Sequence, residues 1–164
     1  IANQDTIISC SYSSTVCETF KIAVEKKGEF NVIIAESRYN NVNYGEISAQ
    51  QLKQHGIPVT VIPDKDINRH IAKTNKSFVG ADTILIDGSL VNGIPTYKLA
   101  QAAANAKVPF YSVCEIAKFD LLNQHRKQCK PEPGFDLIPS NFITGIITEA
   151  GITKPADVIN FQRY

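Results

Sequence analysis

The chain has 164 residues, of which 17 are lysine or arginine and 16 are aspartate or glutamate, so its formal net charge is +1. This balance, without long runs of one sign, argues against direct nucleic acid binding and against membrane binding through bulk electrostatics. No apolar stretch reaches the roughly 20 residues needed to cross a bilayer, and residues 1–5 lack the form of a signal peptide. We therefore expect a soluble, cytoplasmic protein with one domain over residues 1–164, which buries roughly 70% of the surface of the unfolded chain.

The cysteines and histidines form no metal-binding motif. The four cysteines, at positions 10, 17, 114 and 129, lack C-x-x-C spacing. The three histidines, at positions 55, 70 and 125, fall in no metal-ligand pattern. The signatures G-x-G-x-x-G and G-x-x-x-x-G-K-[ST] do not occur in the sequence. We therefore expect reduced thiols, no metal and no cofactor.

Short β-branched runs alternate with helical patterns through the first half of the chain. Thr15-Val16-Cys17-Glu18 has the form of a capping box, and Lys26-Lys27-Gly28 is a typical helix end. Residues 39–45 are polar and indicate a loop. In chain order we expect a strand at 6–10, a helix from 15 to about 26, a strand at 31–35, a helix at 48–55, a strand at 58–63 and a short helix at 64–73.

The second half is organised around residues 79–97. A strand from Lys76 leads into Gly80-Ala81-Asp82, and two apolar runs then flank Asp87-Gly88, the signal for a two-residue hairpin turn. We expect a helix at 96–106, a strand at 109–114, a surface loop at 121–134, a strand at 143–148 and a helix at 155–162. This alternation predicts a Rossmann-like, doubly wound α/β fold, with a mainly parallel sheet, helices on both faces and one β-hairpin.

Polar side chains follow four of the expected parallel strands, and open α/β folds bind ligands at the carboxyl ends of their strands. An arginine there can hold a phosphate through a forked contact. The helix entered from Ser13 offers free amides and a positive dipole end to the same group. The expected rim consists of Cys10-Ser11, Glu36 to Arg38, Asp82 and Cys114-Glu115.

Each of these residues also has a plainer interpretation. Asp82 is then a turn residue that satisfies backbone amides. Arg38 and Glu36 form an exposed ion pair of little consequence. Three of the cysteines, Cys10, Cys17 and Cys114, are then small core residues.

Five motifs in order resemble those of one known family. They are Glu36-Ser37-Arg38, Gly56 to Thr60 (GIPVT), Gly80-Ala81-Asp82 with Thr96-Tyr97, Cys114 to Phe119 (CE-x-x-KF), and Phe135-Asp136 with Ile147 to Gly151. The chain is similar to the C-terminal domain of the family that unites the α, β and δ regulatory subunits of translation initiation factor 2B with methylthioribose-1-phosphate isomerase and ribose-1,5-bisphosphate isomerase. Members of that family carry a helical domain before this point, so the resemblance implies a fragment or a short member.

The resemblance implies roles for individual residues. In the isomerases of the family a cysteine at the end of the first strand and the aspartate of the GAD motif transfer protons, and Asp82 matches the aspartate. Ser11 aligns with the cysteine, whereas Cys10 lies one residue early and should face the other side of the strand. Asn92-Gly93 stands where the isomerases have Asn-Lys, so the phosphate-binding lysine is replaced by Gly93. The ligand-binding residues expected from the pattern are Arg38, Glu36, Ser13 and Asn92.

These two replacements favour a regulatory-subunit-like domain that acts in the control of guanine-nucleotide exchange on initiation factor 2. Its expected partners are a second copy or paralogous subunits, initiation factor 2 and a phosphorylated small molecule, a sugar phosphate or a nucleotide. The alternatives are an aldose–ketose isomerase with Asp82, Ser11 and Cys10 in catalytic roles, and a sugar-phosphate sensor without turnover. The hairpin at 83–91 has apolar side chains on both faces, which predicts a homodimer unless the loop at 121–134 covers one face.

Overall fold

The computed structural model describes residues 1–26, 28–122 and 131–163 of the chain. A seven-stranded sheet forms its centre, with the order β13-β12-β9-β6-β1-β2-β5. All neighbouring strands are parallel except β12 and β13. Their bounds are β1 (Thr6–Ser9), β2 (Asn31–Ala35), β5 (Val59–Ile62), β6 (Lys76–Val79), β9 (Phe110–Val113), β12 (Gly145–Thr148) and β13 (Gly151–Thr153).

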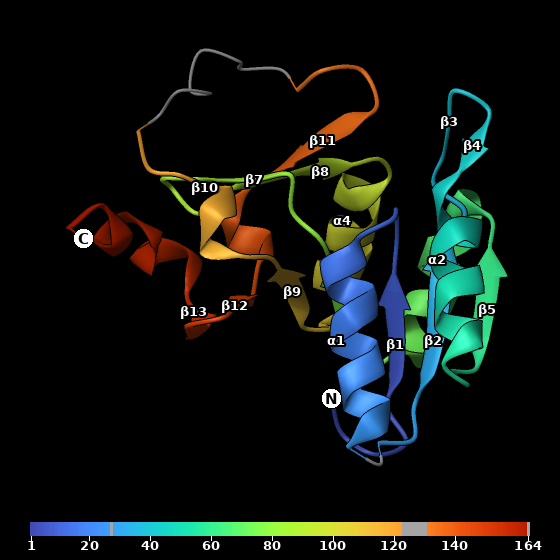
Figure 1. Cartoon of the computed structure of the whole chain (residues 1–164). Coiled ribbons are helices and arrows are strands. Elements are labelled where there is room, and N and C mark those ends of the chain that lie inside the picture. Colours follow the sequence, from blue (N-terminus) through green and yellow to red (C-terminus); the bar gives the residue numbers. More distant parts are fainter. Residues whose placement is uncertain (27, 123–130, 164) are drawn as a thin grey trace.

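Helices cover both faces of this sheet, which confirms the predicted Rossmann-like α/β fold (Figure 1). On one face α1 (Ser14–Glu25) and α2 (Tyr44–Gln54) pack through Val16, Phe20 and Leu52 against apolar side chains of the sheet. On the other face α3 (Ile67–His70) and α4 (Thr96–Ala106) bury a second apolar cluster. None of the helices in the described ranges has the length and apolar composition that a membrane span requires.

A smaller sheet, with the order β10-β7-β8-β11, lies across the carboxyl ends of the main strands (Figure 1). The predicted hairpin is its centre, formed by antiparallel strands β7 (Thr83–Leu85) and β8 (Leu90–Gly93). Two edge strands that the sequence did not predict complete it, namely β10 (Phe119–Asp120) and β11 (Phe135–Ile138).

The hairpin turn is longer than the predicted Asp87-Gly88. The amide of Leu85 donates to the carbonyl of Ser89 at 2.8 Å, so three residues, Ile86 to Gly88, form the turn. Gly88 has φ +79°, the left-handed conformation that closes a three-residue hairpin loop and that glycine adopts without strain. The two-residue prediction was therefore wrong by one residue.

The expected loop at 39–45 is instead a hairpin followed by the first turn of α2. Strands β3 (Arg38–Tyr39) and β4 (Val42–Asn43) are joined by two asparagines with φ of 46° and 64°, a conformation that asparagine tolerates. The side chain of Asn43 then accepts a hydrogen bond from the amide of Glu46 at 2.9 Å. This cap starts α2 four residues before the predicted Ser48.

Other helix boundaries also differ from the sequence pattern. The N-cap of α1 is Ser13, whose Oγ accepts from the amide of Val16 at 3.3 Å, rather than Thr15. Residues Pro155–Arg163 form a 3₁₀ helix instead of the predicted α-helix. Further 3₁₀ turns span Asp64–Asp66, Ile71–Lys73, Ile116–Lys118 and Ser140–Phe142. The greater part of the expected loop at 121–134, with His125 and Cys129, lies outside the described residues.

Candidate functional site

Asp82 stands at the junction of three cavities above the carboxyl ends of the central strands. Asp82 lines all three: an apolar cavity of about 190 Å³ beside Leu85, a middle cavity of about 220 Å³ beside Ser11, and a polar cavity of about 240 Å³ beside Ser13. Its amide donates to the carbonyl of Val91 at 2.9 Å, which ties the end of β6 to the hairpin. We call these three cavities, which share Asp82 as a lining residue, the Asp82 groove.

Small residues before Asp82 allow other elements to approach. A Cβ atom at Gly80 would lie 2.6 Å from both Cβ and Oγ of Ser13, so only glycine lets the N-cap of α1 sit against the end of β6. Ser13 in turn lines the polar cavity together with Asp82 and Asn92. This close contact explains why a glycine occurs at the end of the strand.

Partial burial in the groove raises the pKa of the Asp82 carboxyl above its ordinary value, and the positive charge of Lys118 opposes this shift. The carboxyl group forms no hydrogen bond or ion pair within the described part of the chain. An unpaired carboxylate in a partly desolvated groove can accept hydrogen bonds from a ligand or take up a proton.

Ser11 and Cys10 lie on opposite sides of the strand end. Ser11 lines the middle cavity, with its amide donating to Ser37 Oγ at 2.6 Å and its carbonyl accepting from Ser48 Oγ at 3.0 Å. Cys10 is buried in the core, where its Sγ lies 3.4 Å from Thr96 Oγ1. Burial raises the pKa of Cys10 to about 12, so this thiol stays protonated at neutral pH.

The backbone of Gly93 lies directly against Ser11. A Cβ atom at position 93 would be 2.7 Å from Ser11 Oγ, so a side chain there would require the serine hydroxyl to rotate away. The adjacent Asn92 is buried, and its Nδ2 donates to Thr96 Oγ1 at 2.9 Å. The structure thus brings Ser11, Ser13, Asp82 and Asn92 together around the groove.

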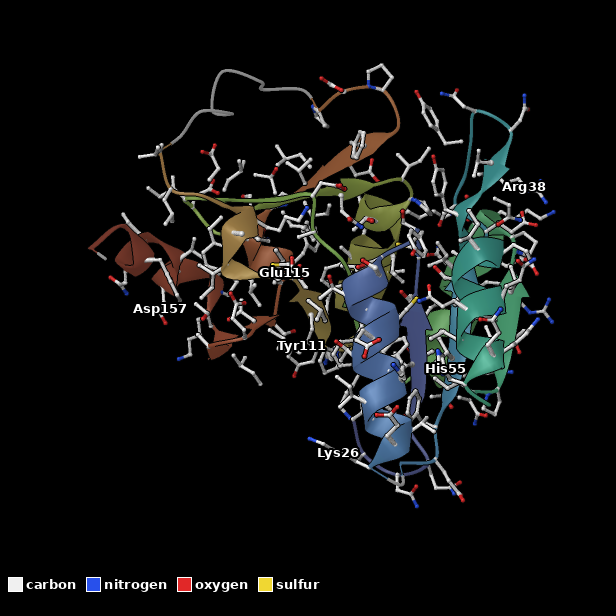
Figure 2. All side chains as sticks on the ribbon, in the orientation of Figure 1. Lys26, Arg38, His55, Tyr111, Glu115 and Asp157 are labelled. Carbon is white, nitrogen blue, oxygen red and sulfur yellow. The ribbon has the colours of Figure 1, made fainter. Side chains whose placement is uncertain are left out.

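Arg38 and Glu36 are not among the residues that line the three cavities. The guanidinium of Arg38 binds both carboxylate oxygens of Glu36, with N–O distances of 3.1 and 3.2 Å. Arg38 is the first residue of β3, and Figure 2 shows it on the opposite side of α1 from Glu115. The role of Arg38 in ligand binding therefore stays a prediction.

Comparison with known proteins decides the family. The model of the initiation factor 2 subunit family matches residues 1–134. The chain belongs to this family. This membership confirms the resemblance drawn from the five sequence motifs.

The family contains proteins with different names and functions. A putative translation initiation factor eIF-2B subunit 2-like protein of Pyrococcus abyssi is 37% identical, over 94% of this chain and 60% of that protein. A ribose 1,5-bisphosphate isomerase of Archaeoglobus fulgidus is 32% identical, over 92% of this chain and 54% of its own length. The crystal structure of the Pyrococcus horikoshii translation initiation factor eIF-2B matches with a TM-score of 0.85 at 33% identity, and the match covers 97% of this chain and 62% of that one. The chain thus spans little more than half of its curated relatives.

The sequence did not predict several residues that line the groove of this family member. Four aromatic side chains surround the middle cavity, namely Tyr12, Tyr39, Tyr44 and Phe135. They come from four separate segments, so no local pattern identifies them as a group. Lys118 lines the polar cavity, and its place in the CE-x-x-KF motif beside Glu115 was the available signal.

Proposed function

We propose that this chain is a non-catalytic, regulatory-type member of the family rather than an aldose–ketose isomerase. The observation that carries the proposal is the composition of the cavity beside Asp82. Ser11 stands there where the isomerase resemblance implies a thiol, and Gly93 stands where it implies a lysine. Cys10 does not replace the missing thiol, because its Sγ lies in the core beside Thr96.

The chain is expected to give no ketose product from ribose 1,5-bisphosphate or methylthioribose 1-phosphate. A serine hydroxyl is far less acidic than a thiol and needs its own activating base. Gly93 also has no ammonium group with which to hold the substrate phosphate. The Archaeoglobus isomerase, assayed in parallel, serves as the positive control. Turnover well above the buffer control that disappears in Asp82→Asn would overturn the proposal in favour of the isomerase.

The regulatory role requires a partner chain, and the outer face of the smaller sheet offers an apolar surface for it. The hairpin buries Ile84 and Leu90 completely on its inner face, whereas Leu85 and Val91 on the outer face, where they line the smallest cavity of the Asp82 groove, stay partly exposed. Phe135 on the neighbouring strand β11 is 37% exposed. A twofold axis would cover this apolar face on both copies, and a paralogous subunit could cover it in the same way.

A homodimer is therefore expected in sedimentation at micromolar concentration, and Leu85→Asp should dissociate it. The matched control is Ile47→Asp, which changes a similarly apolar side chain, 43% exposed on α2, and should leave the dimer intact. A wild-type mass of 18.1 kDa, unchanged by Leu85→Asp, would show that the outer face is covered within one chain.

The phosphorylated ligand expected from the sequence forms part of the same proposal. Arg38 is exposed and Ser13 caps the N-terminus of α1, so a phosphate that reaches both would displace Glu36 from the guanidinium. Calorimetry should then show sugar phosphate binding that Arg38→Ala weakens severalfold and that the exposed control Arg69→Ala leaves unchanged. Equal binding by both variants would exclude Arg38 from the site.

A further inference from the structure

The layer formed by α3 and α4 carries positive charge without acidic residues of its own. Neither these two helices nor the 3₁₀ turn at Ile71–Lys73 contains an aspartate or a glutamate. The helices on the opposite side of the sheet, α1 and α2, contain carboxylates as well as lysines. The layer and the residues that flank it supply five cations, namely Lys65, Arg69, Lys73, Lys98 and Lys107. We call the solvent-facing side of this layer the α3–α4 face.

Three of the cations form a row along the segment between β5 and β6. Lys65, Arg69 and Lys73 follow one another at intervals of four residues, and all three are exposed. Ile67 and Ile71, also four residues apart, are buried in the core, so the segment turns its apolar side inward and its cations outward. Four residues rise about 6 Å in an α-helix and about 8 Å in a 3₁₀ helix, and this segment contains both. The positive groups therefore recur at about 6–8 Å.

Helix α4 packs beside this segment and runs in the same direction. Both connect the carboxyl ends of the main strands to the amino end of a parallel strand, β6 in one case and β9 in the other. Lys107, at the end of α4, therefore lies toward the same end of the layer as Lys73. Gln101 and Asn105 are exposed one turn apart on α4, and their amide groups can hydrogen-bond a peptide backbone.

The five cations form no ion pair within the described part of the chain, because the ion pairs found there involve other residues. Asp64 and Asp66 begin the same segment, but both are partly buried. Asp64 is also directed toward the end of β2, where its Oδ1 accepts from the amide of Ser37 at 2.8 Å. The α3–α4 face thus presents uncompensated positive charge to an anionic partner.

An acidic protein segment fits this face better than a nucleic acid does. Domains that bind nucleic acids are typically strongly basic, with a pI above about 9, whereas this chain has a pI of about 7.8 and a net charge of +1. Among the described residues of α3 and α4, Tyr97 is the one exposed aromatic side chain, so successive bases would find no stacking platform. In an extended peptide every second residue lies about 6.6 Å further along, which matches the interval of the cations.

We propose that the α3–α4 face binds an acidic segment of a partner protein, with carboxylates at alternate positions of the segment opposite Lys65, Arg69 and Lys73. The inference goes beyond the proposed function, since it requires neither the Asp82 groove nor a homodimer through the smaller sheet. Its contacts are exposed ion pairs, so the binding is weak and depends on salt.

Fluorescence anisotropy of a labelled dodecapeptide of alternating glutamate and serine tests the proposal on the 164-residue chain. Arg69→Glu/Lys73→Glu should weaken binding at least about tenfold, because two attractions become repulsions. The matched control is Lys26→Glu/Lys53→Glu, which changes the net charge equally at exposed positions on the opposite side of the sheet, and Figure 2 shows Lys26 at the end of α1. It should change the affinity less than about twofold, and binding by the wild type should fall between about 20 mM and about 150 mM salt.

Melting curves show whether each variant is folded, and Arg69→Gln/Lys73→Gln tests the same contacts without reversing their charge. Equal weakening by both double glutamate variants would mean that the peptide responds to net charge alone, and the proposed site would be wrong. Absence of peptide binding by the wild-type chain at low salt would overturn it as well. Single-stranded RNA of the same length that binds more tightly than the peptide, and is lost in Arg69→Glu/Lys73→Glu, would reassign the face to nucleic acid.

Discussion

Replacing Gly45 by alanine should lower the free energy of unfolding by at least about 3 kcal/mol. Gly45 lies in the first turn of α2, and its amide donates to the carbonyl of Glu36 at 2.9 Å. An added Cβ would clash with the carbonyl oxygen of Ala35 and lie 2.9 Å from its carbonyl carbon. These are backbone atoms that cannot rotate away. The gain in helix propensity from glycine to alanine, about 1 kcal/mol, is too small to offset the clash.

The same substitution should also disturb the groove, because Tyr44 lines the middle cavity and Ser48 donates to the carbonyl of Ser11. Urea denaturation measures the stability, and Gln50→Ala on the exposed side of the same helix is the matched control, with an expected change within about 0.5 kcal/mol. A loss below 1 kcal/mol for Gly45→Ala would show that α2 moves away from β2 at little cost.

The central sheet could be predicted because its signal is local. Short β-branched runs such as Asn31 to Ala35 can bury both faces only inside a covered parallel sheet, and the helices between them have clear patterns. The order of the strands does not follow from that alternation, and the structure shows that β1, β2, β6 and β9 are neighbours in the sheet.

The smaller sheet was only half predicted because its outer strands depend on distant partners. Strand β11 begins at Phe135 and pairs with β8, more than 40 residues earlier in the chain, and β10 is two residues long. Neither strand has the alternation that marks an independent strand. The hairpin between them was predicted because its turn and both of its strands are continuous in sequence.

The residues of the candidate site also divide into those that local sequence predicts and those that tertiary contacts place. The strand ends placed Ser11 and Asp82 at the rim, and strand periodicity separated Cys10 from Ser11, since both depend only on nearby residues. The aromatic walls and the position of Arg38 depend on how the β3–β4 hairpin and the segment before β11 fold over the sheet. That arrangement is set by tertiary contacts such as the one between Gly134 and Tyr39.

The ion pair between Lys76 and Asp5 should make a large, pH-dependent contribution to stability. Lys76 Nζ donates to Asp5 Oδ2 at 2.6 Å, and the amide of Ala2 donates to the same oxygen at 2.7 Å. Burial alone would raise the pKa of the Asp5 carboxyl, but these hydrogen bonds and the positive charge of Lys76 outweigh it and hold the pKa below its ordinary value. A lowered pKa in the folded state stabilises the protein above the unfolded value of about 3.9, and this contribution is lost as the pH falls through the folded value.

Lys76→Met should therefore cost about 3 kcal/mol at pH 7, the lower end of the range for breaking a buried pair, because the Lys76 side chain is 28% exposed while that of Asp5 is only 8% exposed. The difference between the variant and the wild type should shrink as the pH falls below about 4, since a protonated Asp5 no longer needs the ammonium group. Lys21→Met breaks the exposed pair with Glu18, whose side chain is 55% exposed, and should cost less than about 1 kcal/mol at every pH. Denaturation curves of the three proteins at pH 7 and pH 3 measure these differences. A loss for Lys76→Met that is equal at both pH values would mean that the pairing of Lys76 with ionised Asp5 does not account for the loss.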